Sequence, residues 1–288
     1  MRWIVGIDTR NRSQGALRFA GWLREQMRDA DYESRGFHVL EHDEMMVLLR
    51  RSHLTEVLTD AESSLRKAVE SAQAGDILTS AEVVQAATAE RFLAEATKVR
   101  NADGLIIGRS AAREGRAIVR LGRVARRLVR MLPAPVIVTP PDLEVEHLGD
   151  GPVLCAVSPT LECVDAARTA IGLAKKLGRE AILVHGVKLP DAVSLSGSFH
   201  DELLREQRES AQESLAVFCE AHGLADARRE VVLGAPEDTV PRRTEELRAP
   251  LVVCGSRRLD VVQRMFRSSV GTDLASHSKV PVMIVPPR

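Results

Sequence analysis

The sequence predicts an α/β protein made of two tandem domains, each a doubly wound, five-stranded parallel sheet. The segment that begins WIVGID at Trp3 recurs as PVLCAVS from Pro152, about 150 residues later. LIIGRS at 105–110 recurs as VVCGSR at 252–257, and the two copies close on APVIVTPP and VPVMIVPP. Short apolar runs alternate with amphipathic stretches, a pattern typical of parallel strands joined by right-handed crossover helices.

The first copy is predicted to form a domain over residues 1–141. Apolar runs without alternation indicate strands that are buried on both faces, and apolar residues three or four apart indicate helices. Ala16, Leu17, Ala20 and Leu23 share one such helix face. The predicted strands are 3–7, 36–41, 77–84, 104–108 and 135–139, and the predicted helices are 13–28, 54–68, 88–100 and 115–131.

The second copy is predicted to form a domain over residues 151–288 with the same alternation. A linker at 140–152, bounded by prolines and otherwise polar, separates the two domains. The predicted strands are 153–157, 181–186, 229–233, 250–254 and 281–285, and the predicted helices are 161–177, 199–222, 236–247 and 268–278.

Composition favours a cytoplasmic protein. The 288 residues carry a formal net charge of zero, so no general affinity for nucleic acid or an anionic membrane is expected. No apolar run approaches the roughly 18 residues of a membrane span. The four cysteines form no C-x-x-C pair and the histidines form no ligand motif, so neither a disulfide framework nor a required metal is predicted.

Candidate ligand residues follow the first and fourth strands of each copy. In open parallel sheets, ligands bind at the carboxyl ends of the strands, near the point where the strand order reverses. These loops contain Asp8 and Gly108 in the first copy, and Ser158 and Gly255 in the second.

This pattern resembles the universal stress protein family in its tandem two-domain form. The resemblance rests on a first strand followed by Asp8, a fourth strand ending in Gly108, a charged helix and a closing Pro-Val strand, and it covers nearly the whole chain. It implies a Rossmann-like, adenine-nucleotide-hydrolase-like fold with strand order 3-2-1-4-5. It also implies an ATP site in which the aspartate holds the nucleoside. A G-x-x-G, nine residues, G-[ST] motif holds the phosphates at a helix N-terminus.

The first copy keeps part of that motif. Asp8 matches the nucleoside-binding aspartate and Gly108 the first glycine, whereas Ala111 replaces the second glycine. Gly122 fits the third glycine one residue late and is followed by Arg123 instead of a hydroxyl residue. A turn residue that satisfies its own loop is the alternative role for Asp8.

The second copy keeps a different part. Ser158 replaces the aspartate, Arg258 the second glycine and Ser268 the third, and Ser269 retains the hydroxyl. An ordinary helix cap is the alternative role for these serines. The residues predicted to bind nucleotide here are Gly255, Ser256, Arg258, Ser268 and Ser269, and this copy is expected to bind more readily than the first.

The function predicted from these features is that of a stress-response regulatory or binding protein with degenerate adenine-nucleotide (ATP) sites, and not of an enzyme. The alternative is a nucleotide-free scaffold of the same fold that binds a protein partner. The resemblance also implies that the domains pair along the strands at 135–139 and 281–285, with a homodimer as a further assembly.

Three further features have two readings each. Arginines recur every three or four residues on one helix face, which serves either an anion or, as we favour, ion pairs and solvent. Cys155 and Cys254 lie on strands expected to be neighbours, and inert buried thiols are favoured over a redox pair. His185 ends a strand at the ligand edge, where a structural hydrogen bond is favoured over a ligand role. The arginines are Arg113, Arg116, Arg120, Arg123, Arg127 and Arg130.

Overall fold

The computed structural model divides into two compact units. The first unit comprises residues 1–147 with 275–281, and the second comprises 148–274 with 282–288. The first break between them falls within the predicted linker. The described residues are 1–9, 14–27, 32–50, 52–109, 121–188, 198–225, 227–256 and 270–287.

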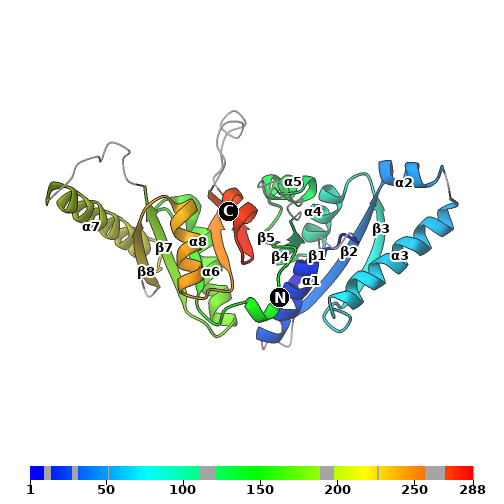
Figure 1. Cartoon of the computed structure of the whole chain (residues 1–288), viewed down its shortest axis with the longest axis horizontal. Coiled ribbons are helices and arrows are strands. Elements are labelled where there is room, and N and C mark those ends of the chain that lie inside the picture. The colour runs from blue at the N-terminus through cyan, green and yellow to red at the C-terminus, as the bar shows by residue number, and fades with distance from the viewer. Residues whose placement is uncertain are drawn as a thin grey trace. The chain divides into compact units, whose positions relative to one another are not determined.

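The first unit contains a parallel sheet in the order β3-β2-β1-β4-β5 (Figure 1). Its strands are β1 (Arg2–Gly6), β2 (Glu33–Glu41), β3 (Ser80–Ala86), β4 (Gly104–Gly108) and β5 (Val136–Thr139). Its described helices are α1 (Gln14–Gln26), α2 (His42–Leu48), α3 (Leu54–Ser71), α4 (Ala89–Val99) and α5 (Arg123–Met131), with the 3₁₀ turn η1 (Val145–His147).

The second unit repeats this order as β8-β7-β6-β9-β10. Counted within each unit, both sheets therefore run 3-2-1-4-5, which confirms the predicted fold class. The strands are β6 (Val153–Ala156), β7 (Ala181–Val187), β8 (Arg228–Leu233), β9 (Val252–Gly255) and β10 (Val282–Val285). The described helices are α6 (Val164–Lys176), α7 (Ser198–Ala221), α8 (Pro236–Glu246) and α9 (Val270–His277), with the 3₁₀ turn η2 (Leu161–Cys163).

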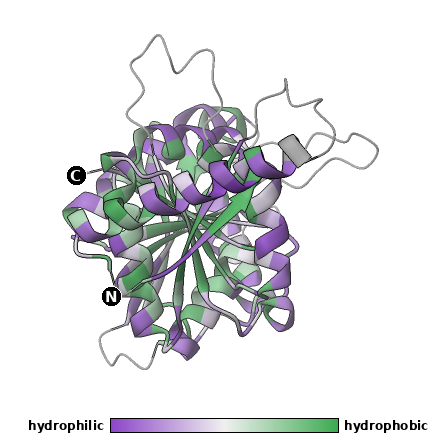
Figure 2. Cartoon of the chain, turned by 90° about the vertical axis from the view of Figure 1, so that its left-hand side faces the viewer, coloured by the Kyte–Doolittle hydropathy of each residue, from purple (hydrophilic) through white to green (hydrophobic). Residues whose placement is uncertain are grey.

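The central strands form the core of each unit. Val5, Ile106 and Ile137 are fully buried in the first sheet, as are Leu154 and Val253 in the second. In Figure 2 most of the strands are green, whereas the helices carry both purple and green residues. Burying one such side chain contributes roughly 1.5–3 kcal/mol, which explains why these strands have apolar residues on both faces.

One predicted strand begins later than expected. The apolar run at 77–84 predicts a strand, but β3 begins only at Ser80. A Cβ on Gly21 would lie 2.5 Å from Cδ1 of Ile77, and a Cβ on Gly36 would lie 3.0 Å from Cδ1 of Leu78. Ile77 and Leu78 are therefore apolar because they pack against glycines of α1 and β2, not because they pair in the sheet.

Helix α2 was not predicted from the sequence. None of its residues is buried, so it lacks the apolar periodicity that marks a packed helix. Asp43 and Glu44 lie in its first turn, where negative charge interacts favourably with the helix dipole. This short helix begins directly after β2 and brings Glu44 to the carboxyl ends of the strands.

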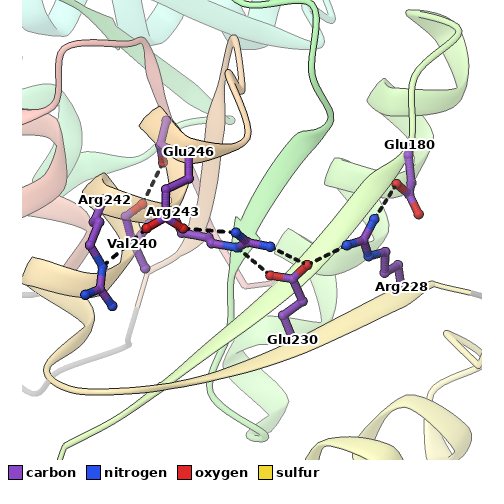
Figure 3. A network of polar contacts seen from close by, with 8 residues as sticks. Glu180, Arg228, Glu230, Val240, Arg242, Arg243 and Glu246 are labelled. Atoms are coloured by element: carbon purple, nitrogen blue, oxygen red, sulfur yellow. Dashed lines mark hydrogen bonds and ion pairs between the residues drawn. The ribbon is translucent and has the colours of Figure 1, made fainter.

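A network of ion pairs joins the edge strand β8 to α8 in the second unit (Figure 3). Arg243 donates two hydrogen bonds to the carboxylate of Glu230, from Nε at 2.6 Å and Nη2 at 3.0 Å. Arg228 donates a third from Nη2 at 2.9 Å, and its Nη1 lies 3.3 Å from Glu180. The hydrogen bonds from Arg243 lower the pKa of Glu230 despite its partial burial. Such two-pronged contacts fix the edge strand on the helix.

Candidate functional site

The carboxyl ends of β1, β2 and β4 enclose a pocket in the first unit. Its volume is about 330 Å³, and Asp8, Gly108 and Gly122 all line it. The sheet explains this convergence, because β1 and β4 are direct neighbours with Gly6 opposite Ile107. The three site residues predicted for the first copy thus lie around one cavity.

A histidine holds the turn that presents Asp8. Nδ1 of His38 lies 3.0 Å from the carbonyl oxygen of Ile7, and the Ile7 N–H donates to the Phe37 carbonyl at 2.9 Å. A carbonyl only accepts, so Nδ1 carries the proton and Nε2 is an acceptor in the neutral ring. Since the Ile7 carbonyl belongs to the same peptide group as the Asp8 N–H, His38 fixes the start of this turn.

Glu41 closes another side of the pocket. Its Oε1 accepts a hydrogen bond from the backbone N–H of Ala89 at 2.9 Å, in the first turn of α4. Its Oε2 pairs with Arg123 at the start of α5. Glu41 therefore satisfies a free N–H at a helix N-terminus and binds the arginine that stands in place of the expected hydroxyl residue.

A second carboxylate, that of Glu90, lies behind this pair. Its side chain is only 5% exposed and pairs with Arg127, while Nη1 of Arg123 lies 3.7 Å from Oε2. Burial alone would raise the pKa of Glu90, but the hydrogen bond from Arg127 and the charges of Arg127 and Arg123 hold it below its ordinary value. Glu90 is therefore an anion at neutral pH and depends on these arginines.

The arginine face is in part structural. Arg123 and Arg127 pair with Glu41 and Glu90, which come from β2 and α4 of the same unit. This confirms the favoured reading for these two arginines. Arg130 is exposed. The remaining members of the face, Arg113, Arg116 and Arg120, and the glycine replacement Ala111 lie outside the described residues.

The same framework recurs in the second unit. Nδ1 of His185 lies 2.9 Å from the Val157 carbonyl, and the Val157 N–H donates to the Val184 carbonyl at 2.9 Å. The structural reading of His185 is thus confirmed. Because His185 corresponds to His38, the residue three positions later, exposed Lys188, corresponds to Glu41.

Gly255 is engaged in packing. A Cβ there would lie 2.8 Å from the carbonyl oxygen of Glu162 and 3.5 Å from Sγ of Cys163. The N–H of the next residue, Ser256, donates to the Val285 carbonyl at 3.0 Å, so it is not directed at a phosphate as we expected. Gly255 therefore lets η2 approach the end of β9. Arg258, Ser268 and Ser269 lie outside the described residues, so their predicted role stays a prediction.

Three thiols lie near this part of the second unit. Cys155 and Cys254 are buried on neighbouring strands, with Cys155 opposite Val253 in the register. Burial raises the pKa of Cys155 well above its ordinary value and that of Cys254 to about 12. Both are free thiols, so the expectation of buried, unreactive cysteines is confirmed. Cys163 differs, because it is only partly buried and its Sγ accepts from the Ser158 N–H at 3.4 Å.

Among the described residues, no group of three or more His, Cys, Asp or Glu side chains is placed to hold a metal ion. Within the same ranges, no helix has both the length and the apolar character needed to cross a membrane.

The fold and the pocket define the class of this protein as a tandem doubly wound α/β protein with a pocket at the carboxyl edge of its first sheet. The model of the universal stress protein family matches residues 1–140 and again 151–286. The chain therefore belongs to the universal stress protein family, as a tandem two-domain member.

Individual relatives agree with this assignment. A universal stress protein of Methanocaldococcus jannaschii is 26% identical over 126 residues, 42% of this chain and 74% of that protein. A putative universal stress protein of Staphylococcus aureus (strain USA300) is 25% identical over 144 residues, 46% of this chain and 82% of that protein. Among solved structures, a universal stress protein of Archaeoglobus fulgidus superposes with a TM-score of 0.67 at 18% identity, covering all of this chain and 98% of the other. That likeness supports the fold.

Proposed function

We propose that this universal stress protein is a cytoplasmic regulatory protein without catalytic activity, whose first unit binds an adenine nucleotide, or a part of one, chiefly through the nucleoside. The observation that carries the proposal is the pocket of about 330 Å³ that Asp8, Gly108 and Gly122 line together. That volume lies at the low end of the range for small-molecule pockets, roughly 300–1,000 Å³.

The lining suits a nucleoside. Ile7, Val39, Leu93 and Ile107 offer an apolar surface for a base, and Asp8 offers a carboxylate that can accept from ribose hydroxyls. A regulatory role fits the same lining, because His38 uses Nδ1 to hold a backbone carbonyl instead of activating a nucleophile.

The test compares ligand binding in wild type and Asp8→Ala. Losing a charged hydrogen bond of roughly 1.5–3 kcal/mol should weaken adenosine or adenine-nucleotide binding by about tenfold or more. Calorimetry with adenosine, AMP and ATP measures the change, and mass spectrometry of ligand released from the denatured protein identifies what copurifies. Ser158→Ala, the matched change in the second unit, should leave this binding intact. Equal affinity in wild type and Asp8→Ala would exclude the proposed role of the pocket.

A nucleotide-free scaffold remains the second candidate, and one observation favours it. Gly255, the glycine that the second copy retains, is explained by its close contact with Glu162 and needs no phosphate. If no adenine compound copurifies or binds, and binding to a protein partner depends on surface residues alone, the scaffold function replaces the proposed one.

A further inference from the structure

Arg123 is the described pocket cation nearest to Gly122, and it is already engaged. It pairs with Glu41, whose side chain is 18% exposed, and lies within 3.7 Å of Glu90, which is 5% exposed. Oε2 of Glu90 is buried and makes no hydrogen bond, so Arg123 is the cation that faces it. Turning Arg123 toward a bound phosphate would strip a cation from two largely buried carboxylates, which is strongly unfavourable.

The N-terminus of α4 is also engaged. Helix N-termini attract phosphate because their first N–H groups lack partners within the helix. Here the Ala89 N–H, which borders the pocket, donates to Oε1 of Glu41 at 2.9 Å. A carboxylate of the protein thus occupies a place that a phosphate oxygen would take.

The charges of the described lining also disfavour a phosphate. Among the described residues that line the pocket, Asp8, Glu41 and Glu44 are acidic and Arg123 is the basic residue. These four side chains together have two more negative than positive charges, which disfavours a phosphate next to them and favours a ligand group that brings hydrogen-bond donors.

From these observations we infer that the pocket of the first unit selects an uncharged nucleoside over its phosphorylated forms, and that Glu41 determines this selectivity. The inference rests on the proposed function, since it names the class of ligand for the same pocket. Its basis is that Glu41 engages two donors of the described lining, the Arg123 guanidinium and the Ala89 N–H, that could otherwise bind a phosphate.

The second unit supplies the natural exchange for a test. Lys188 stands where the first unit has Glu41, at the same distance along the chain from the histidine that holds the turn. Glu41→Lys therefore installs the second unit's charge in the first unit's pocket. Glu41→Gln removes the charge while keeping an oxygen that can accept from the Ala89 N–H, so it guards against loss of folding.

The experiment measures Kd values of the full chain for adenosine, AMP and ATP by calorimetry, counting only binding that Asp8→Ala abolishes. In the wild type, adenosine should bind more tightly than ATP by about tenfold or more. Glu41→Gln should lower the ratio of the ATP Kd to the adenosine Kd, and Glu41→Lys should lower that ratio by about tenfold or more. The effect of Glu41→Lys should weaken as the salt concentration rises. Lys188→Glu is the matched control and should leave the ratio unchanged.

The outcomes distinguish a failure of this inference from a failure of the proposed function. If Asp8-dependent binding of ATP is as tight as that of adenosine in the wild type, the inference falls and the proposed function stands. If adenosine is preferred but Glu41→Lys and Glu41→Gln leave the ratio unchanged, Glu41 does not determine the selectivity and the inference is overturned. If no compound binds in an Asp8-dependent way, both fall.

Discussion

The ligand edges of the two units share a backbone but differ in charge. In both, a histidine donates to the carbonyl of the residue that follows the first strand, and the N–H of that same residue donates to a carbonyl of the second strand. The first unit places Glu41 and Asp8 at this edge, whereas the second places Lys188 and Ser158 at the corresponding positions. Backbone geometry is thus kept where burial and register enforce it, while loop side chains diverge.

The retained glycines show a related difference. Gly108 lines the pocket of the first unit. Gly255 instead lets the Glu162 carbonyl approach closely in the second unit. Glycine at equivalent positions of the repeat therefore lines a cavity in the first unit and allows a turn to pack closely in the second.

The largest effect is expected from removing the ion pairs that distinguish the first unit. Arg123→Gln with Arg127→Gln should leave Glu90 buried without a cation and lower the free energy of unfolding by about 3–5 kcal/mol. Both tryptophans of the chain, Trp3 and Trp22, belong to the first unit, so urea unfolding followed by tryptophan fluorescence reports on that unit.

Two controls accompany this change. Adding Glu90→Gln to the double variant should restore much of the lost stability, because the buried carboxylate without a cation is then removed. Lys188→Gln in the second unit removes an exposed charge and should alter stability by no more than about 0.5 kcal/mol. A double variant as stable as wild type would mean that the arginine face is not structural here.

An intermediate effect is expected at the two glycines. Gly255→Val should destabilise the second unit by about 1–3 kcal/mol, since its Cβ would lie 2.8 Å from the Glu162 carbonyl oxygen. The unfolding transition seen by circular dichroism should then shift while the tryptophan transition stays in place. Gly108→Val, the counterpart, should chiefly weaken ligand binding to the first unit. If Gly255→Val leaves both transitions unchanged, the packing role of Gly255 is wrong.

The smallest effect concerns the network on β8, which belongs to the second unit. Because the hydrogen bonds from Arg243 lower the pKa of Glu230, this carboxylate stabilises the fold above its ordinary pKa of 4.5, and the stabilisation is lost as pH falls through the lowered value. Glu230→Gln should cost about 1–2 kcal/mol at neutral pH. Urea unfolding followed by circular dichroism should show that the difference in free energy of unfolding between wild type and variant shrinks in acid. A difference in free energy of unfolding that does not change with pH would argue against an ionic contribution of Glu230 to stability.

The sequence predicted the sheets well because strands buried on both faces need apolar residues at every position. It also predicted that Asp8 and Gly108 would lie close together, since neighbouring parallel strands bring their following loops together, and the family resemblance added Gly122 to the same pocket. It did not predict Glu41, which lies 82 residues from its partner Arg123. A single acidic residue at the end of a strand has no local pattern that reveals a distant partner.

The arginine periodicity illustrates the same limit. Spacing alone predicts that Arg123 and Arg127 share a helix face, but not what that face meets. The answer depends on Glu90, whose burial comes from the packing of α4 against α5 and cannot be inferred from either segment alone. The sequence did not predict helix α2, because none of its residues is buried and its sequence therefore shows no apolar periodicity.

The histidine that holds each turn also couples two neighbouring strands. His38 belongs to β2 and His185 to β7, and Nδ1 of each donates to the carbonyl of the residue that follows the adjacent strand, β1 or β6. The start of the turn that presents Asp8 is therefore fixed by a side chain of another strand and not by the loop alone. A displacement of β2 relative to β1 would be transmitted directly to this turn.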